Sequence, residues 1–285
     1  MIAVGYPFWS DVWIRSGWRV QTRGGVCRLL DDRDRLVCRG TRKECIALAR
    51  GLAPRARRRR SAILLHGLGR SRRFMRILAE ALEGRGWAVA TPGYASLSQR
   101  FDAHVRAVRS IADALVEDGA EEVDLIGHSL GGLIARAAMD ESWPGGRCVL
   151  IGAPNRGAQM AERIRRIPLG RLLLGPCAEA LMPEAAAALP VPAAPILVIA
   201  GGNGGRGWNP LLPGDDDFTV GVEETRLGDA ETRFVRVRSL HFRLPMHRDV
   251  VSAMLEFLGP VTAAETSPAP AGESGGGSLS APLFP

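Results

Sequence analysis

Residues 123–132, with the sequence VDLIGHSLGG, decide the fold of this chain. An apolar run ends at Gly127, and apolar residues at helical spacing begin at Leu130. A serine at a sharp strand-to-helix turn projects its hydroxyl away from the backbone, and such a turn has room only for glycine at the flanking positions. The stretch therefore predicts a strand, a tight turn and a helix, with Ser129 at the turn as the candidate nucleophile.

Short apolar strands alternate with helical segments from Ser61 onward. The expected strands are 62–65, 87–90, 122–127, 148–151, 196–200 and 234–237. Helices are expected after Ser71, near 97–118, after Ser129 and over 250–258, with short helices covering the site in 155–190. This alternation predicts a mostly parallel central sheet flanked by helices.

Residues 1–60 are predicted to form a separate, small, strand-rich appendage. Short strands are expected at 18–23, 26–30 and 35–38, followed by a helix over 41–52. Thr41 and Glu44 have the spacing of a capping box at the start of that helix. The predicted organisation is an appendage and arginine-rich linker (1–60), a main α/β domain (61–259) and a disordered tail of Pro, Ala, Ser and Gly (260–285).

Composition limits the class of protein. The chain has 285 residues, 46% of them hydrophobic, but no run near the roughly 20 apolar residues of a membrane span. The amino terminus lacks the pattern of a secretion signal. Its five cysteines are scattered without metal-ligand spacing. We therefore expect reduced thiols, a cytoplasmic protein, and neither metal nor cofactor.

The net charge of +7 is a weak indication of a polyanionic partner. Lys43 is the only lysine, and an arginine bias of this kind reflects coding composition, so no nucleic-acid partner is predicted. The run Arg55–Arg60 is interpreted as a solvated linker, and the aromatic residues of 6–18 as a segment docked on the protein body. The alternative is a weak peripheral membrane contact through these aromatics and the Arg55–Arg60 run.

Five segments together resemble one superfamily. They are His66–Ser71 (HGLGRS), Gly127–Gly132 (GHSLGG), Gly152–Gly157 (GAPNRG), Asp217–Leu227 (DFTVGVEETRL) and Ser239–Phe242 (SLHF). The pattern, over about residues 61–258, resembles the α/β-hydrolase superfamily, and within it small bacterial lipase-like and esterase-like members. The resemblance implies an α/β-hydrolase fold.

An acyl-transfer site needs a nucleophile, a base that takes its proton and an acid that orients the base. In this architecture the chain order is serine, acid, histidine, which Ser129, Asp217 and His241 satisfy. His241 directly follows the last predicted strand. The other four histidines are less suited as the base: His66, which is expected to pack under the neighbouring loop, His104, inside a predicted helix, His128, within the elbow, and His247, just before the last helix.

The acid has an alternative in the adjacent Asp216. The register of the segment 220–227 favours Asp217, yet the family usually has glycine directly after the acid, where this chain has Phe218. If that position requires a positive φ, phenylalanine is costly there. Glu223 and Glu224 are interpreted as solvated or salt-bridged residues.

Two main-chain donors are expected to form an oxyanion hole. One is the N–H of Leu130, which follows the nucleophile, and the resemblance implies that the second is Leu68 N–H in the His66–Gly69 loop.

The sequence thus predicts a serine hydrolase that cleaves lipid-like or other hydrophobic carboxylic esters through an acyl-enzyme. The apolar stretch 167–192 either lines an acyl pocket or packs as core and cover. Two alternatives stay open: a thioesterase, amidase or acyltransferase with the same three residues, and a non-catalytic binding module on the same fold.

Overall fold

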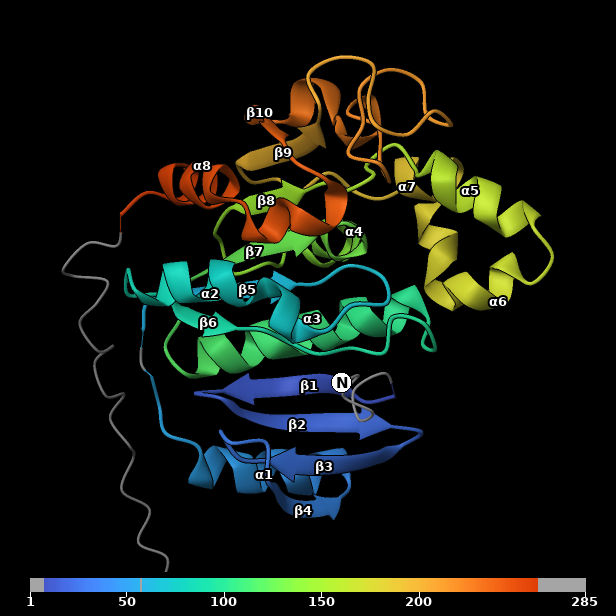
Figure 1. The fold of residues 1–285 in the computed structure, drawn as a ribbon. Coiled ribbons are helices and arrows are strands. Elements are labelled where there is room, and N and C mark those ends of the chain that lie inside the picture. The colour runs from blue at the N-terminus through green and yellow to red at the C-terminus, as the bar shows by residue number, and fades with distance from the viewer. Residues whose placement is uncertain (1–7, 57, 261–285) are drawn as a thin grey trace, which may run out of the picture.

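The computed structural model describes residues 8–56 and 58–260. They form two separate sheets with their helices, and the smaller sheet lies below the larger one in Figure 1. The larger sheet has six strands in the order β10-β9-β8-β7-β5-β6, all parallel. Its strands are β5 (Arg60–Leu65), β6 (Ala88–Ala90), β7 (Glu122–His128), β8 (Cys148–Ile151), β9 (Ile196–Gly202) and β10 (Arg233–Arg238). Every strand expected in this region is present, so the α/β prediction is confirmed.

Both faces of this sheet are covered by helices. Ile63 and Leu65 of β5 belong to the core shared with α3 (Phe101–Glu117) and α4 (Leu130–Ala138). Ala62 and Leu64 belong to the opposite core, with α2 (Arg76–Glu83) and α8 (Arg248–Leu258). Successive strand residues point to opposite faces, and here both faces are apolar. A strand buried on both sides reads as a continuous apolar run, which is why β5 and β7 were recognisable in the sequence.

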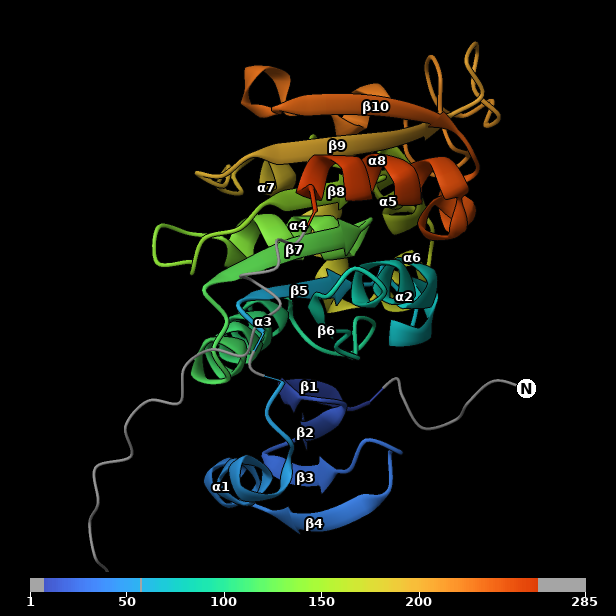
Figure 2. The ribbon, with the colours of Figure 1, turned by 90° about the vertical axis from the view of Figure 1, so that its left-hand side faces the viewer.

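The smaller sheet is an antiparallel meander, with strands β1 (Ser10–Arg15), β2 (Trp18–Arg23), β3 (Val26–Leu30) and β4 (Leu36–Gly40). Helix α1 (Arg42–Leu52) packs on one face of this sheet, and the edge strand β1 contacts α3 of the main domain (Figure 2). The two helices also contact each other, since Arg50 of α1 pairs with Glu117 of α3 at 2.5 Å. Its core joins Val20 and Leu29 to Cys45 of α1 and to Ala107 and Ala114 of α3. The capping box is confirmed: the Thr41 side chain accepts the Glu44 N–H, and the Glu44 carboxylate accepts the Thr41 N–H.

Strand β1 was not expected, because its sequence does not alternate apolar and polar residues. All six of its residues are buried, including Asp11 and Arg15. Asp11 is paired with Arg19 at 3.1 Å, and Arg15 with Asp118 at 3.4 Å. The aromatic segment therefore docks on the protein body, as Trp13 is 2% exposed.

The end of the arginine run does not behave as a solvated linker. Arg60 is buried at the start of β5, where its guanidinium contacts Asp124 at 3.2 Å and the carbonyl of Leu258 at 2.9 Å. Arg59 pairs with Glu121 at 2.6 Å. Neither arginine is therefore free for a flat anionic surface. No helix within the described ranges is long and apolar enough to cross a membrane.

The segment 155–190 folds into short helices, as expected: α5 (Gln159–Arg166), α6 (Gly170–Leu174), the 3-10 helix η2 (Pro176–Leu181) and α7 (Pro183–Ala187). Arg136 of α4 binds both ends of this segment. Its buried guanidinium donates to the carbonyls of Asn155 (3.0 Å) and Ala186 (3.3 Å), and to those of Leu189 (2.8 Å) and Pro190 (3.3 Å). The predicted tail lies outside the described residues.

Candidate active site

Ser129 occupies a strained elbow between β7 and α4. Its φ of 56° and ψ of −124° lie in a region that residues other than glycine rarely adopt. The elbow is fixed because Ser129 N–H donates to the Ile151 carbonyl at 2.9 Å. A Cβ at Gly127 would lie 2.3 Å from the Gly131 carbonyl oxygen, and one at Gly131 would lie 2.4 Å from the Leu65 oxygen. Both glycines are therefore required sterically, as the pentapeptide predicted.

A second tight turn, after β5, lies against the elbow. Arg70 N–H donates to the Gly67 carbonyl at 3.2 Å, and Gly69 has the positive φ (65°) that a type II turn needs at its third residue. Gly67 approaches the nucleophile so closely that an added Cβ would lie 3.1 Å from the Ser129 Cβ. We name residues 67–70 the oxyanion turn.

Two main-chain donors near Ser129 are unused. The N–H groups of Leu68 and Leu130 have no acceptor within the part of the chain that the structure describes. Leu130 N–H is free because it begins α4, and first-turn amides of a helix have no partner within the helix. Unused N–H groups beside a nucleophile are available to a developing oxyanion.

Asp217 and His241 are in direct contact. Asp217 Oδ2 lies 2.6 Å from His241 Nδ1, and the carboxylate also accepts N–H groups of Thr219 (3.0 Å) and Val220 (2.7 Å). The main chain joins the two residues again, because His241 N–H donates to the Asp217 carbonyl at 2.8 Å. Asp216 points elsewhere: its carboxylate accepts the N–H groups of Asn209 and Phe218.

The His241 ring lies at the same sheet edge as Ser129. It packs beside the ring of His128, with centroids 4.7 Å apart, and over Gly152, where an added Cβ would lie 3.2 Å from Nδ1. Gly152 follows Ile151, the residue that accepts Ser129 N–H. The described residues include no hydrogen bond between the Ser129 hydroxyl and the His241 ring.

The loop that holds Asp217 has two unusual features. Phe218 has a φ of +83°, so the costly geometry foreseen for this position does occur. Glu224 is neither solvated nor salt-bridged, contrary to expectation. Its buried carboxylate accepts the N–H groups of Gly221 (2.8 Å) and Gln159 (2.8 Å), and burial raises its pKa. Glu224 thus ties the acid loop to the start of α5.

The other histidines have structural environments. His66 stacks on Tyr94 at 3.9 Å, and Tyr94 lies against His104 at 4.9 Å. Burial lowers the pKa of both His66 and His104 to about 4. Burial also lowers the pKa of His128, whose Nε2 contacts the His241 carbonyl at 3.1 Å. His247 caps α8 by accepting Asp249 N–H.

The oxyanion turn is supported by the loop of residues 93–99. Gly69 N–H donates to Ser96 Oγ at 3.0 Å, and the Tyr94 hydroxyl donates to the His66 carbonyl. These bonds fix both ends of the turn. These bonds could not be predicted, because Tyr94 and Ser96 lie in a stretch without helical or strand periodicity.

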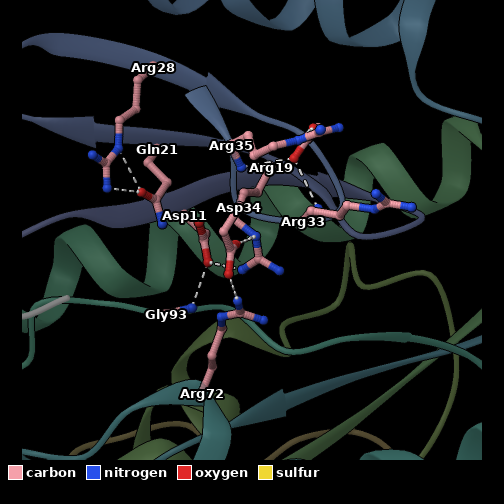
Figure 3. Close-up of polar contacts among 10 residues, drawn as sticks. Asp11, Arg19, Gln21, Arg28, Arg33, Asp34, Arg35, Arg72 and Gly93 are labelled. Atoms are coloured by element: carbon pink, nitrogen blue, oxygen red, sulfur yellow. Dashed lines mark hydrogen bonds and ion pairs between the residues drawn. The ribbon is translucent and has the colours of Figure 1, made fainter. Parts of the chain in front are cut away.

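The amino-terminal sheet in turn holds this supporting loop. Asp11 and Gly93 exchange two hydrogen bonds: Asp11 N–H donates to the Gly93 carbonyl (2.8 Å), and Gly93 N–H donates to Asp11 Oδ2 (2.7 Å). The same carboxylate contacts Arg19, which also pairs with Asp34, and Asp34 reaches Arg72 (Figure 3). A continuous polar network thus runs from β1 to the residues that follow the oxyanion turn.

A hollow of about 350 Å³ lies between Leu97 and the short helices of the segment 155–190, and its lining includes the charged residues Arg165, Arg171 and Glu179. Leu97 lines it and lies 3.8 Å from the Cβ position of Gly69. Leu174 and Pro176 contribute further apolar surface. The stretch 167–192 therefore divides. The apolar residues of Cys177 to Met182 pack into the core, whereas five large apolar residues stay exposed, namely Ile167, Leu169, Leu172, Leu173 and Val191.

The chain belongs to the alpha/beta hydrolase family, whose model matches residues 62–277. Solved structures with this fold include the Bacillus licheniformis lipase BlEst2 in its mature form: 16% identity, 70% of this chain and 89% of that chain covered, TM-score 0.54. The propeptide form of BlEst2 is 15% identical, with 72% of this chain and 51% of that chain covered and a TM-score of 0.58.

An esterase from Pyrococcus furiosus is 14% identical, with 89% of this chain and 90% of that chain covered and a TM-score of 0.53. That share of this chain exceeds what residues 61–285 alone can supply, so the match extends into the amino-terminal part. At these identities the likeness concerns the fold. No curated protein matches the sequence.

Proposed function

We propose that the protein is a serine hydrolase that cleaves carboxylic esters of hydrophobic acyl groups through an acyl-enzyme. The observation that carries the proposal is the 2.6 Å contact between Asp217 and His241 at the sheet edge where Ser129 forms its elbow. Both side chains are buried. A general base needs an acid that fixes its tautomer, and Asp217 is placed to do this for His241.

The proposal gives each residue a role. His241 takes the proton of Ser129 as the hydroxyl attacks the ester carbonyl, and returns it to the leaving alcohol. Asp217 fixes the ring with the proton on Nδ1 and stabilises the imidazolium that forms. The Leu68 and Leu130 N–H groups donate to the oxyanion. Water, activated by His241, then cleaves the acyl-enzyme.

The substrate class rests on the hollow beside the oxyanion turn. An acyl chain that extends from the oxyanion turn past Leu97 would reach the apolar surface of Leu97 and Leu174 in this hollow, whose other walls carry charged side chains. Burying each methylene of the chain there contributes about 0.8 kcal/mol. This arrangement favours hydrophobic acyl esters over short acetates.

The test is labelling by a fluorophosphonate probe combined with hydrolysis of p-nitrophenyl esters from two to sixteen carbons. The unaltered protein should be labelled and Ser129→Ala should not, while Ser142→Ala, at an exposed serine, keeps the label. Thioester and anilide analogues of the best substrate separate esterase from thioesterase or amidase. A folded protein that neither labels nor hydrolyses any ester would instead be the binding module.

A peripheral membrane contact remains part of the proposal only through exposed residues. Phe8 is 49% exposed at the amino-terminal end, and Leu172 is 77% exposed on the cover. Vesicle sedimentation with Phe8→Ser and with Leu172→Ser identifies the contributing surface. Equal pelleting of both variants and the parent protein would exclude these contacts.

A further inference from the structure

Phe218 is unfavourable in two respects. Its φ of +83° is a strained conformation for a bulky side chain, and 57% of its surface is exposed to solvent. Neither the fold nor the ester chemistry proposed above requires an aromatic side chain there. Backbone strain that persists at a surface position is a reason to look for a ligand beside it.

Phe218 forms one wall of a second hollow of about 500 Å³. The other walls come from the loop after β9, the end of β10 and the 3-10 helix η5 (His241–Met246). The lining side chains on which the argument depends are Trp208, Phe218, Arg238, Leu240, Arg243 and His247. None of its lining residues lines the hollow beside Leu97 and Leu174, which we call the acyl hollow, so the two hollows are separate.

The charge of this hollow is one-sided. The side chains of Arg238 and Arg243 form no ion pair or hydrogen bond with any residue in 8–56 or 58–260. Their neighbours along the chain are neutralised, since Arg236 contacts Asp215 at 3.5 Å and Arg248 contacts Asp249 at 3.3 Å. No acidic side chain lines the hollow. Two unpaired guanidinium groups facing one cavity attract an anion.

His247 adds a third donor. Its Nδ1 accepts the Asp249 N–H at 3.2 Å, so the neutral ring carries its proton on Nε2. The Asp249 carboxylate lies 3.9 Å from the same Nδ1. Two arginines and one ring N–H suit the three terminal oxygens of a phosphate better than the two of a carboxylate.

The aromatic side chains define the rest of the ligand. Trp208 is half-buried and Phe218 is exposed, and both present ring surface to the cavity. A flat apolar ring covers such surface and removes it from water. We propose that this hollow binds an aromatic phosphate ester, with the ring against Trp208 and Phe218 and the phosphate on Arg238 and Arg243. The proposal does not depend on ester hydrolysis.

The test is calorimetric titration of the full chain carrying Ser129→Ala, so that the result is independent of the proposed chemistry. The probe is 1-naphthyl phosphate, with 1-naphthoate, 1-naphthol and inorganic phosphate as comparisons. We expect saturable 1:1 binding of 1-naphthyl phosphate. Each of the three comparison compounds should bind about tenfold more weakly or worse, because each lacks the ring or the phosphate.

Variants locate the site. Arg238→Ala and Arg243→Ala should each weaken binding about tenfold or more, whereas Arg248→Ala, an exposed arginine outside the hollow, should stay within about twofold. Phe218→Gly should weaken binding without lowering the melting temperature, because glycine relieves the strained φ. A purely structural phenylalanine would give the opposite pair of results.

Three outcomes would overturn the proposal. They are no binding of 1-naphthyl phosphate, equally tight binding of inorganic phosphate, and unchanged affinity in both arginine variants. Each can occur whether or not Ser129 reacts with a fluorophosphonate, so failure of this site is distinguishable from failure of the proposed hydrolase activity.

Discussion

Asp34, in the turn between β3 and β4, forms an ion pair with Arg72, the first residue of η1 (Arg72–Met75) and two residues beyond the oxyanion turn. The contact joins the amino-terminal sheet to the segment that faces Ser129. Arg19 links Asp34 to Asp11, and Asp11 is bonded twice to Gly93. The small sheet is therefore a part of the site's support rather than an independent module.

Asp11→Asn should destabilise the protein by about 3 kcal/mol, because it removes one partner of a fully buried ion pair. Esterase activity should fall as well, since the supporting loop is held by the same carboxylate. Urea unfolding measures the first effect and p-nitrophenyl ester hydrolysis the second. Asp102→Asn, at an exposed pair with Arg106, is the matched control. Equal stability of the two variants would contradict the assigned importance of Asp11.

Gly67→Ala should lower kcat/KM by about 10- to 100-fold while the protein stays folded. The new Cβ would lie 3.1 Å from the Ser129 Cβ and from His128 Nδ1, so the oxyanion turn must shift away from the nucleophile. Gly51→Ala serves as the control, because a Cβ there meets no atom within 4 Å and alanine favours the helix. Full activity of Gly67→Ala would show that the turn takes no part in catalysis.

Asp217→Asn should lower kcat by about 10³- to 10⁴-fold, because an amide no longer selects the His241 tautomer with the proton on Nδ1. KM should change little, as Asp217 has no contact with the acyl hollow. Asp216→Asn perturbs the same loop without touching His241, so it should affect stability more than kcat. Similar kcat values for the two variants would remove Asp217 from its proposed role.

Acid should destabilise the protein between pH 6.5 and about pH 4. The pKa values of His66 and His104 are lowered to about 4 in the folded chain from the ordinary 6.5, so the unfolded chain binds these protons first. The contribution of the two neutral rings to the free energy of unfolding is complete above pH 6.5. It is lost as the pH falls toward 4, at up to about 1.4 kcal/mol per pH unit for each ring. Urea unfolding at pH 7.5, 6 and 5 measures the slope.

His104→Phe should reduce that slope. Neither ring nitrogen of His104 has a hydrogen-bond partner within the described structure, so phenylalanine removes the titrating group without breaking a bond. An unchanged slope would mean that other groups control the acid sensitivity.

The strands and helices of the main domain were predictable because each is a local pattern. The apolar run before Gly127 and the helical spacing after Leu130 need no distant partner to be recognised. The chain order of Ser129, Asp217 and His241 likewise follows from where each residue lies relative to a strand. The preference for Asp217 over Asp216 agrees with the contact that His241 makes.

Features that depend on distant partners could not be predicted. Strand β1 buries Asp11 and Arg15, and contacts with distant partners, among them Arg19 and Asp118, make that burial tolerable. The arginine run around Arg60 predicts a solvated side chain, but Asp124, which is distant in the sequence, pairs with Arg60 and allows it to be buried. Glu224 accepts main-chain N–H groups from two segments. One of them contains Gln159, 65 residues away, and no local sequence pattern predicts a hydrogen bond over that separation.

Arg136 has a consequence for how substrate reaches Ser129. Because its guanidinium binds the carbonyls of both Asn155 and Leu189, the segment between these two residues is anchored at both ends to α4, the helix that follows Ser129. A segment anchored at one end opens about a hinge there, whereas a segment anchored at both ends can move only in its middle. Here the middle carries the exposed Leu172 and Leu173. In the proposed hydrolase, changing the length of the segment around Leu172 and Leu173, rather than loosening one of its ends, is therefore the direct route to altering which acyl chains can enter.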